Sequence, residues 1–171
     1  MLVALVAGAP LRAQSLSNFS ALVNLAPGGT CTVGFFVPGS TSTTLLLRAV
    51  GGASLQHFGV SNPGTAPGMQ IFNSKGMSFI FATTDIGVNF PALYASVGAF
   101  PLTIGAYCST CGGFSPGAYT VQITDDSGHG GTVLFEVYLV SSSNPALGGP
   151  LPVTPVTGLP VLPVTTTTTG P

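Results

Sequence analysis

The chain has 171 residues, of which 45% are hydrophobic and 4% are charged, and its formal net charge is −1 at pH 7. Disordered chains are typically charged and poor in apolar residues, so this composition predicts that most of the chain folds. Three Lys and Arg residues in total cannot neutralise a row of phosphates, which argues against nucleic acid as a partner. So few charges also leave little repulsion between copies, which favours self-association.

Residues 1–13 form an apolar run that ends in small residues before Gln14. This pattern is typical of a secretory signal peptide and predicts a mature chain that starts at Gln14, secreted or held at the cell surface. The alternatives are a first β-strand or a membrane anchor. An anchor needs about 20 apolar residues, and Pro10 and Arg12 interrupt this run. No other stretch is long enough to cross a bilayer, so we expect no transmembrane span.

Residues 14–142 are predicted to form one domain of seven or eight short strands, with turn signals roughly every ten residues. Residues 53–60 are expected to form a helical turn or compact loop, and Leu93, Val97 and Phe100 fall at the spacing of a short helix despite Pro91. Because no long helices alternate with the strands, the pattern predicts an all-β antiparallel sandwich or jelly roll. The predicted strands are Phe19–Leu25, Thr30–Val37, Thr43–Val50, Met69–Phe72, Met77–Ala82, Ile104–Cys108 and the two halves of Gly117–Val140.

The stretch Gly117–Val140 is predicted to be the central element of this domain. Apolar and polar residues alternate on both sides of the Gly-rich segment Asp125–Gly131, as in strands with one buried face. Three Gly, two Asp and a Ser in that segment are typical of a turn. We therefore expect a β-hairpin here, and a second one around Asn73–Gly76.

Residues 143–171 have a different composition, with Pro every few residues and a run of Thr. Such a segment cannot form a helix or a strand ladder and is predicted to be an extended Pro/Thr-rich linker or stalk. The Thr residues are either sites of O-glycosylation or part of a bare spacer.

Three blocks of the domain together resemble a family. They are Leu45–Val60, Val97–Leu102, and the pair Ser115–Ile123 and Gly131–Tyr138. These blocks resemble a poorly characterised β-sandwich module of large secreted and surface proteins of environmental bacteria. The stretch Pro116–Thr120 is also similar to the pre-peptidase C-terminal domain, a jelly-roll accessory module. The resemblance implies an accessory or adhesive module with no catalytic residues to carry over. The chain departs from the family at Gly51-Gly52, where the family has Gly-Pro.

Little in the sequence points to catalysis. No Gly-x-Ser-x-Gly element accompanies the Gly-rich turn around His129. Asp126 and Glu136 could form an acid–base pair across the hairpin, but a solvated turn and an outward strand position explain them better. Asp125 and Asp126 supply too few oxygens for a calcium ion. We therefore expect no enzyme, no cofactor and no metal.

The motif Cys108-Ser-Thr-Cys111 predicts a disulfide, since an exported protein meets an oxidising environment. Gly112-Gly113 would let the chain turn and bring the two Cys together. Zinc binding and a thioredoxin-like redox role are weaker alternatives. Cys31 is left as a buried thiol, an intermolecular bridge or a partner of one of the other two.

Two sets of residues complete the predicted sites. Arg48 either grips a ligand carboxylate, pairs with a carboxylate such as Glu136, or caps loop carbonyls. The residues with predicted structural roles are Arg48, Gly51, Gly52, Gly117 and Tyr119. The predicted interface consists of apolar residues expected to face outward, namely Phe36, Leu46, Leu134 and Tyr138.

These features favour a non-catalytic extracellular or cell-surface module for adhesion, assembly or spacing, with other protein domains or further copies as partners. The alternative is a carbohydrate-binding accessory module of a secreted hydrolase, with glycans as ligands. Its candidate aromatic platform is Tyr94, Tyr107 and Tyr138, because the chain has no Trp. A small hydrolase is disfavoured by the scarcity of His and carboxylates.

Overall fold

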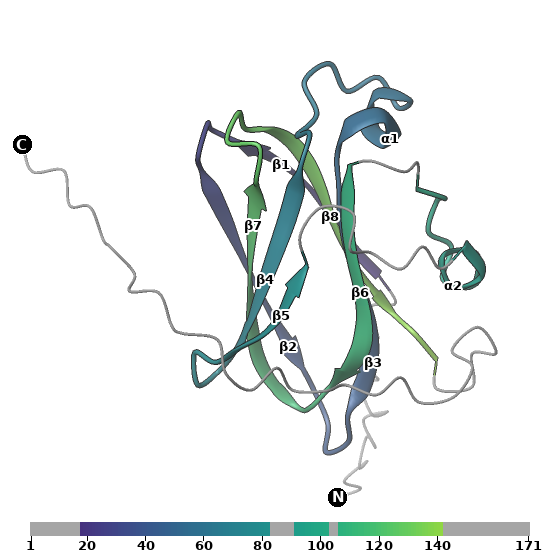
Figure 1. The fold of residues 1–171 in the computed structure, drawn as a ribbon. Coiled ribbons are helices and arrows are strands. Elements are labelled where there is room, and N and C mark those ends of the chain that lie inside the picture. Colours follow the sequence, from purple (N-terminus) through teal and green to yellow (C-terminus); the bar gives the residue numbers. More distant parts are fainter. Residues whose placement is uncertain (1–17, 83–90, 103–105, 142–171) are drawn as a thin grey trace, which may run out of the picture.

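The computed structural model describes residues 18–82, 91–102 and 106–141, and the predicted signal peptide and Pro/Thr-rich linker lie outside these residues. The described chain forms two four-stranded sheets with the strand orders β1-β8-β3-β6 and β2-β7-β4-β5, and they make the two layers in Figure 1. All strand pairs within them are antiparallel. This strand order is that of an eight-stranded jelly roll, so the predicted all-β sandwich is confirmed. The strands are β1 Asn18–Leu25, β2 Thr30–Val37, β3 Thr43–Val50, β4 Pro67–Asn73, β5 Ser78–Ala82, β6 Tyr107–Phe114, β7 Gly117–Asp125 and β8 Gly131–Leu139.

The main core lies between the two sheets and follows from the alternation in the strands. In β7, Tyr119, Val121 and Ile123 are buried while the residues between them are half-buried. Val133 and Phe135 of β8 point into the same cluster from the other sheet. Burial of every second residue gives a strand such as β7 one apolar face, which is the pattern expected of stacked antiparallel sheets.

The predicted hairpin at Gly117–Val140 is wrong, although its two strands exist. β7 pairs with β2 and β4, whereas β8 pairs with β1 and β3, so the Gly-rich turn crosses from one sheet to the other. Sheets stack about 10 Å apart, a gap that the residues between Asp125 and Gly131 can span. Gly128, Gly130 and Gly131 have positive φ and supply the bend. The prediction failed because turn chemistry marks a reversal but does not say which strand becomes the partner.

The hairpin around Asn73–Gly76 is confirmed. β4 and β5 pair on either side of it. The Asn73 side-chain oxygen accepts hydrogen bonds from the backbone N–H groups of Lys75 and Met77, and Gly76 has φ +70°. Asn and Gly are favoured at such positions for these two reasons.

A second layer covers the outer face of the β1-β8-β3-β6 sheet. It consists of α1 Gly52–Gln56, α2 Pro91–Ser96 and the segment that follows α2, and Figure 1 shows both helices on that side of the sandwich. Leu55, Leu93 and Leu102 pack there against the outward residues of β3 and β8. Both faces of β3 are therefore buried, whereas β1 at the edge of the sheet is mostly exposed. Among the described residues, no helix is long and apolar enough to cross a membrane.

Candidate functional site

Arg48 lies on β3 beneath the second layer, where its neighbours leave no room for a ligand. Its guanidinium Nε donates to Glu136 Oε2 at 2.8 Å, and Nη1 donates to the Phe100 carbonyl oxygen at 2.7 Å. The guanidinium lies 4.6 Å from the Phe100 ring centre and 4.8 Å from that of Tyr94. Arg48 is 0% exposed and Glu136 is 3% exposed. Arg48 is thus a structural residue that joins β3, β8 and the segment after α2.

Tyr138 completes this buried network by donating from its hydroxyl to Glu136 Oε1 at 2.7 Å. Burial is the largest cause that raises the pKa of Tyr138, and the hydrogen bond to the Glu136 carboxylate raises it further. The phenol therefore stays protonated and remains a donor throughout the ordinary pH range.

Most of the predicted interface is not on the surface. Leu46 and Tyr138 are buried beneath the second layer, and Leu134 is half-buried against it. The residues do face outward from their sheet, but two short helices cover that face. The predicted sugar platform fails for the same reason, because Tyr94 and Tyr107 are also buried there. The remaining member, Phe36, lies on β2 and is 68% exposed.

The predicted disulfide between Cys108 and Cys111 is wrong. The strand β6 runs through the motif and through Gly112-Gly113 as far as Phe114, so the chain does not turn there. Residues three apart in a strand face opposite sides, and Cys108 points into the main core while Cys111 points into the second layer. Burial raises the pKa of Cys108 to about 12 and that of Cys111 to about 11. Cys31 is a half-buried thiol on the inner face of β2.

The turn residues are engaged in holding loops together. Asp125 is buried, and its Oδ1 accepts a hydrogen bond from the Ala66 backbone N–H at 2.7 Å. Gly52 N–H donates to the Gly64 carbonyl oxygen at 2.8 Å, and a Cβ on Gly51 would lie 2.0 Å from that oxygen. Within the described residues, no group of three His, Cys, Asp or Glu side chains could hold a metal ion.

Gly117 and Tyr119 start β7. Gly117 has φ +147°, a conformation that favours glycine. The Tyr119 hydroxyl donates to the Ser115 carbonyl oxygen at 2.8 Å, and its ring stacks on Phe35 at 5.4 Å between ring centres. These contacts tie the turn before β7 to the edge strand β2.

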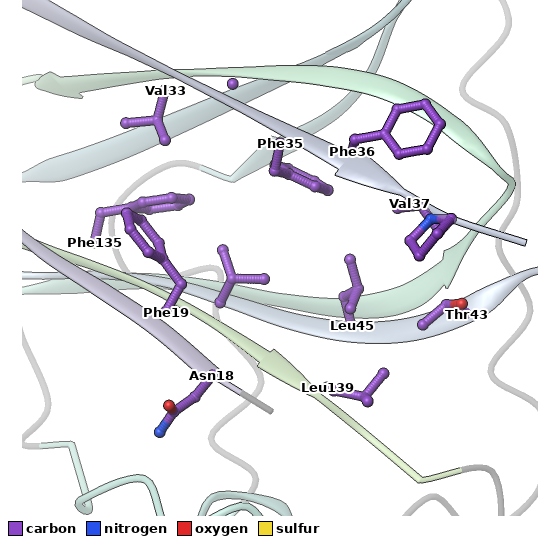
Figure 2. Close-up of a pocket in the computed structure, with 13 residues that line it drawn as sticks. Asn18, Phe19, Val33, Phe35, Phe36, Val37, Thr43, Leu45, Phe135 and Leu139 are labelled. Carbon is purple, nitrogen blue, oxygen red and sulfur yellow. The ribbon is translucent and has the colours of Figure 1, made fainter. Parts of the chain in front are cut away.

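A cleft with a volume of about 480 Å³ lies between β1 and β2. There the partly buried side chains of Val33, Phe35 and Val137, which pack against the main core, reach the solvent, whereas Phe135 and Leu45 stay buried. Figure 2 shows Phe19 and Leu45 reaching into the cleft from one sheet and Phe35 from the other. The ring of Phe19 contacts that of Phe135 edge-on at 6.4 Å between ring centres. The residues that line the cleft are Asn18, Phe19, Val33, Gly34, Phe35, Phe36, Val37, Pro38, Thr43, Leu45, Phe135, Val137 and Leu139.

We define the open side as β1, β2 and this cleft. In the described part of the chain, β1 and β2 are edge strands of their sheets, and most of their residues are exposed. The opposite edge strand β6 is mostly buried, and β5 has only five residues. Of the six large hydrophobic residues exposed in the described chain, four belong to the open side, namely Phe19 (41%), Leu22 (63%), Phe36 (68%) and Leu139 (42%).

Charge is absent from this surface. Neither β1 nor β2 contains a charged residue or a Pro, and the cleft is lined without a charge. Among the described residues, Lys75 and Asp126 are the charged side chains that are exposed. Lys, inward charges and Pro are the usual means by which edge strands avoid pairing, and neither β1 nor β2 has any of them within its bounds.

The outer face of the β2-β7-β4-β5 sheet is a second exposed surface, and it is polar except for Phe36 near the end of β2. Thr32, Gln122 and Gln70 pair side by side across three strands and are exposed or half-exposed. At one end, a Cβ on Gly68 would lie 2.8 Å from both carboxylate oxygens of Asp126, so that carboxylate sits over the sheet.

No family model and no curated protein was found to match the chain. Among solved structures it is similar to a Paenibacillus sp. cycloisomaltooligosaccharide glucanotransferase complexed with cycloisomaltoheptaose, with a TM-score of 0.36 and 14% identity, over 69% of this chain and 14% of that chain. It is also similar to the catalytic domain of a GH87 α-1,3-glucanase in complex with nigerose, with a TM-score of 0.30 and 14% identity, over 74% of this chain and 27% of that chain. The chain thus spans a small part of either protein, and similarity at these TM-scores assigns no function.

Proposed function

We propose that this chain is a non-catalytic assembly module of a secreted or cell-surface protein, and that its open side buries itself against another protein. One observation carries the proposal: an apolar cleft at the margin of the main core opens to solvent between two uncharged edge strands. An exposed apolar patch next to free strand edges is typical of an interface.

The exposed side chains set the strength of such an interface. Fully burying a Leu or Phe contributes roughly 1.5–3 kcal/mol. Leu22 and Phe36 are 63% and 68% exposed, so each offers roughly 1–2 kcal/mol on that scale. Association costs about 4–15 kcal/mol in lost freedom. Side-chain burial from one partner alone is therefore too weak, and the interface needs backbone pairing or similar burial from the partner.

The placement of the titratable groups supports the non-catalytic part of the proposal. Glu136 and Asp125 are buried and hydrogen-bonded to structural partners. His57 and His129 are exposed and lie in different loops. A general acid–base pair requires two groups within hydrogen-bonding reach of one substrate, which this arrangement does not favour.

The test uses the extracellular material of the producing cells, separated by size. We expect the wild type in complexes larger than one chain. Phe36→Asp should elute as one chain because it places a charge on the open side. Met77→Asp is the matched control, since Met77 is 57% exposed but lies in the β4–β5 turn. A wild type that elutes as a single chain, or a Phe36→Asp variant that remains in the complexes, contradicts the proposal.

A second candidate, glycan binding, is favoured by the polar face of the β2-β7-β4-β5 sheet. Its amides and hydroxyls can donate and accept at the same time, and the Asp126 carboxylate can accept from sugar hydroxyls. Affinity electrophoresis against neutral polysaccharides tests it. Retardation of the wild type that is lost in Gln70→Ala and kept in Leu22→Asp, which lies on the other sheet, would support glycan binding at this face, and equal mobility of all three would exclude it.

A further inference from the structure

We propose that the partner of the open side is a second copy of this chain, related by a two-fold axis that passes between the two β1 strands and between the two β2 strands. Both four-stranded sheets would then continue into eight-stranded sheets. This inference rests on the proposed function of the open side and names its partner.

Backbone chemistry favours a copy over an unrelated surface. Along an edge strand, alternate residues direct both N–H and C=O away from the sheet. An antiparallel copy of the same strand presents the same groups in reverse order, so donors meet acceptors. A strand edge is therefore its own complement, and the two-fold axis common in homodimers generates this antiparallel arrangement.

The positions of β1 and β2 allow one axis to serve both strands. Each strand has eight residues, and the short turn between Leu25 and Thr30 joins them. The middle of β1, at Ala21–Leu22, and the middle of β2, at Val33–Gly34, are thus equally far from that turn. Because the two midpoints lie at the same distance from the turn, one two-fold axis can pass through the middle of the β1 pair in one sheet and the middle of the β2 pair in the other.

The direction of the side chains limits how β1 can align with β1 of the second copy. Residues directly opposite each other in a sheet point to the same face. If the two-fold axis passed between two residues of β1, each residue would lie opposite its own neighbour, which faces the other side of the sheet. The axis must therefore pass through a residue, and that residue pairs with its own copy. Near the middle of β1, the self-paired residue is Leu22 or Ala21. Leu22 therefore lies opposite either Leu22 or Ser20 of the second copy.

Charge also favours self-pairing. A charged patch repels a copy of itself, whereas β1 and β2 carry no charge. With the axis at the middle of both strands, Phe19 would lie opposite Val23 or Leu25 of the second copy, and Phe35 opposite Cys31 or Val33, so that apolar residues cover both rings. A two-fold contact uses the same surface on both copies and therefore closes at two. The opposite edges are β6, which is mostly buried, and β5, which has only five residues.

The experiment measures amide hydrogen exchange and cross-linking on the purified full chain in a Cys31→Ser background. We expect alternate amides of β1 and β2 to become protected as the concentration rises, and Leu22→Cys to form a covalent dimer with a short thiol-reactive linker. Met77→Cys is the matched exposed control and should not cross-link. Leu22→Asp should place like charges near the axis and weaken the dimer by about tenfold or more.

The possible results separate a failure of the two-fold pairing from a failure of the proposed function. A dimer whose β1 and β2 amides gain no protection, or assemblies larger than two copies, would overturn the two-fold pairing while leaving the open side as an interface. A purified chain that stays monomeric while extracellular material still forms complexes through Phe36 means that the partner is a foreign protein. A single chain in both measurements refutes the proposed function as well.

Discussion

The buried pair of Arg48 and Glu136 gives the sharpest prediction about stability. In Glu136→Gln, the side chain keeps its shape, but one oxygen becomes an NH₂ group. Arg48 Nε and Nη2 both donate to Glu136 Oε2, so either they would face another donor or Tyr138 would lose its acceptor. The variant leaves the Arg48 charge buried without a counter-ion.

The magnitude follows from that burial. Breaking a buried ion pair by removing one partner costs about 3–5 kcal/mol, whereas an exposed pair contributes about 0–1 kcal/mol. Since Arg48 is 0% exposed, the higher range applies. A domain has a total stability of about 5–15 kcal/mol, so Glu136→Gln should remove a large fraction of it. The double variant Arg48→Met/Glu136→Leu should lose less unfolding free energy than Arg48→Met and Glu136→Leu lose together, because it leaves no buried charge without a partner.

Equilibrium denaturation in urea measures this prediction, with Lys75→Met as the control. Lys75 is exposed, and surface substitutions usually change stability by less than about 0.5 kcal/mol. If Glu136→Gln unfolds within about 1 kcal/mol of the wild type, or if the double variant loses the full sum, the reasoning from a desolvated pair is wrong.

Three further predictions concern other buried groups. Cys108 should react with a thiol reagent only after unfolding, as read from intact mass, because burial raises its pKa to about 12. Stability should fall as pH rises above about 10, because the pKa of Tyr138 is higher in the folded protein and the unfolded chain therefore releases that proton first; Tyr138→Phe should flatten this fall in denaturation series. Gly51→Ala should destabilise by about 1–3 kcal/mol through its clash with the Gly64 carbonyl, whereas Gly113→Ala, with no side-chain or backbone atom nearer than 4.0 Å, should change denaturation little.

The strands could be predicted from the sequence because alternation is a local property. The segments 30–37 and 43–50 have the same bounds in the structure as in the sequence pattern. Strand pairing is not local, and this is where the predictions failed. The segment Gly117–Val140 was expected to fold back on itself, yet its halves belong to different sheets. Gly112-Gly113 was expected to turn, yet the strand continues because β3 pairs with it.

Most of the candidate site could not be predicted from the sequence, because it too depends on contacts between distant segments. Which strands lie at an edge depends on the topology, so the exposure of Phe19 and Leu22 could not be foreseen. Leu46 and Tyr138 do face outward from their sheet, but whether a helix docks on that face depends on packing between distant segments. The one available signal was the lack of charge and Pro in both segments that became β1 and β2.

Sedimentation equilibrium of the purified full chain tests most directly whether the open side joins two copies. It compares the wild type with Phe36→Asp and Met77→Asp over a wide concentration range. We predict that the mass of the wild type and of Met77→Asp rises from one chain to two and stops there, and that Phe36→Asp stays at one chain. Three variants with the same mass at every concentration would contradict the account.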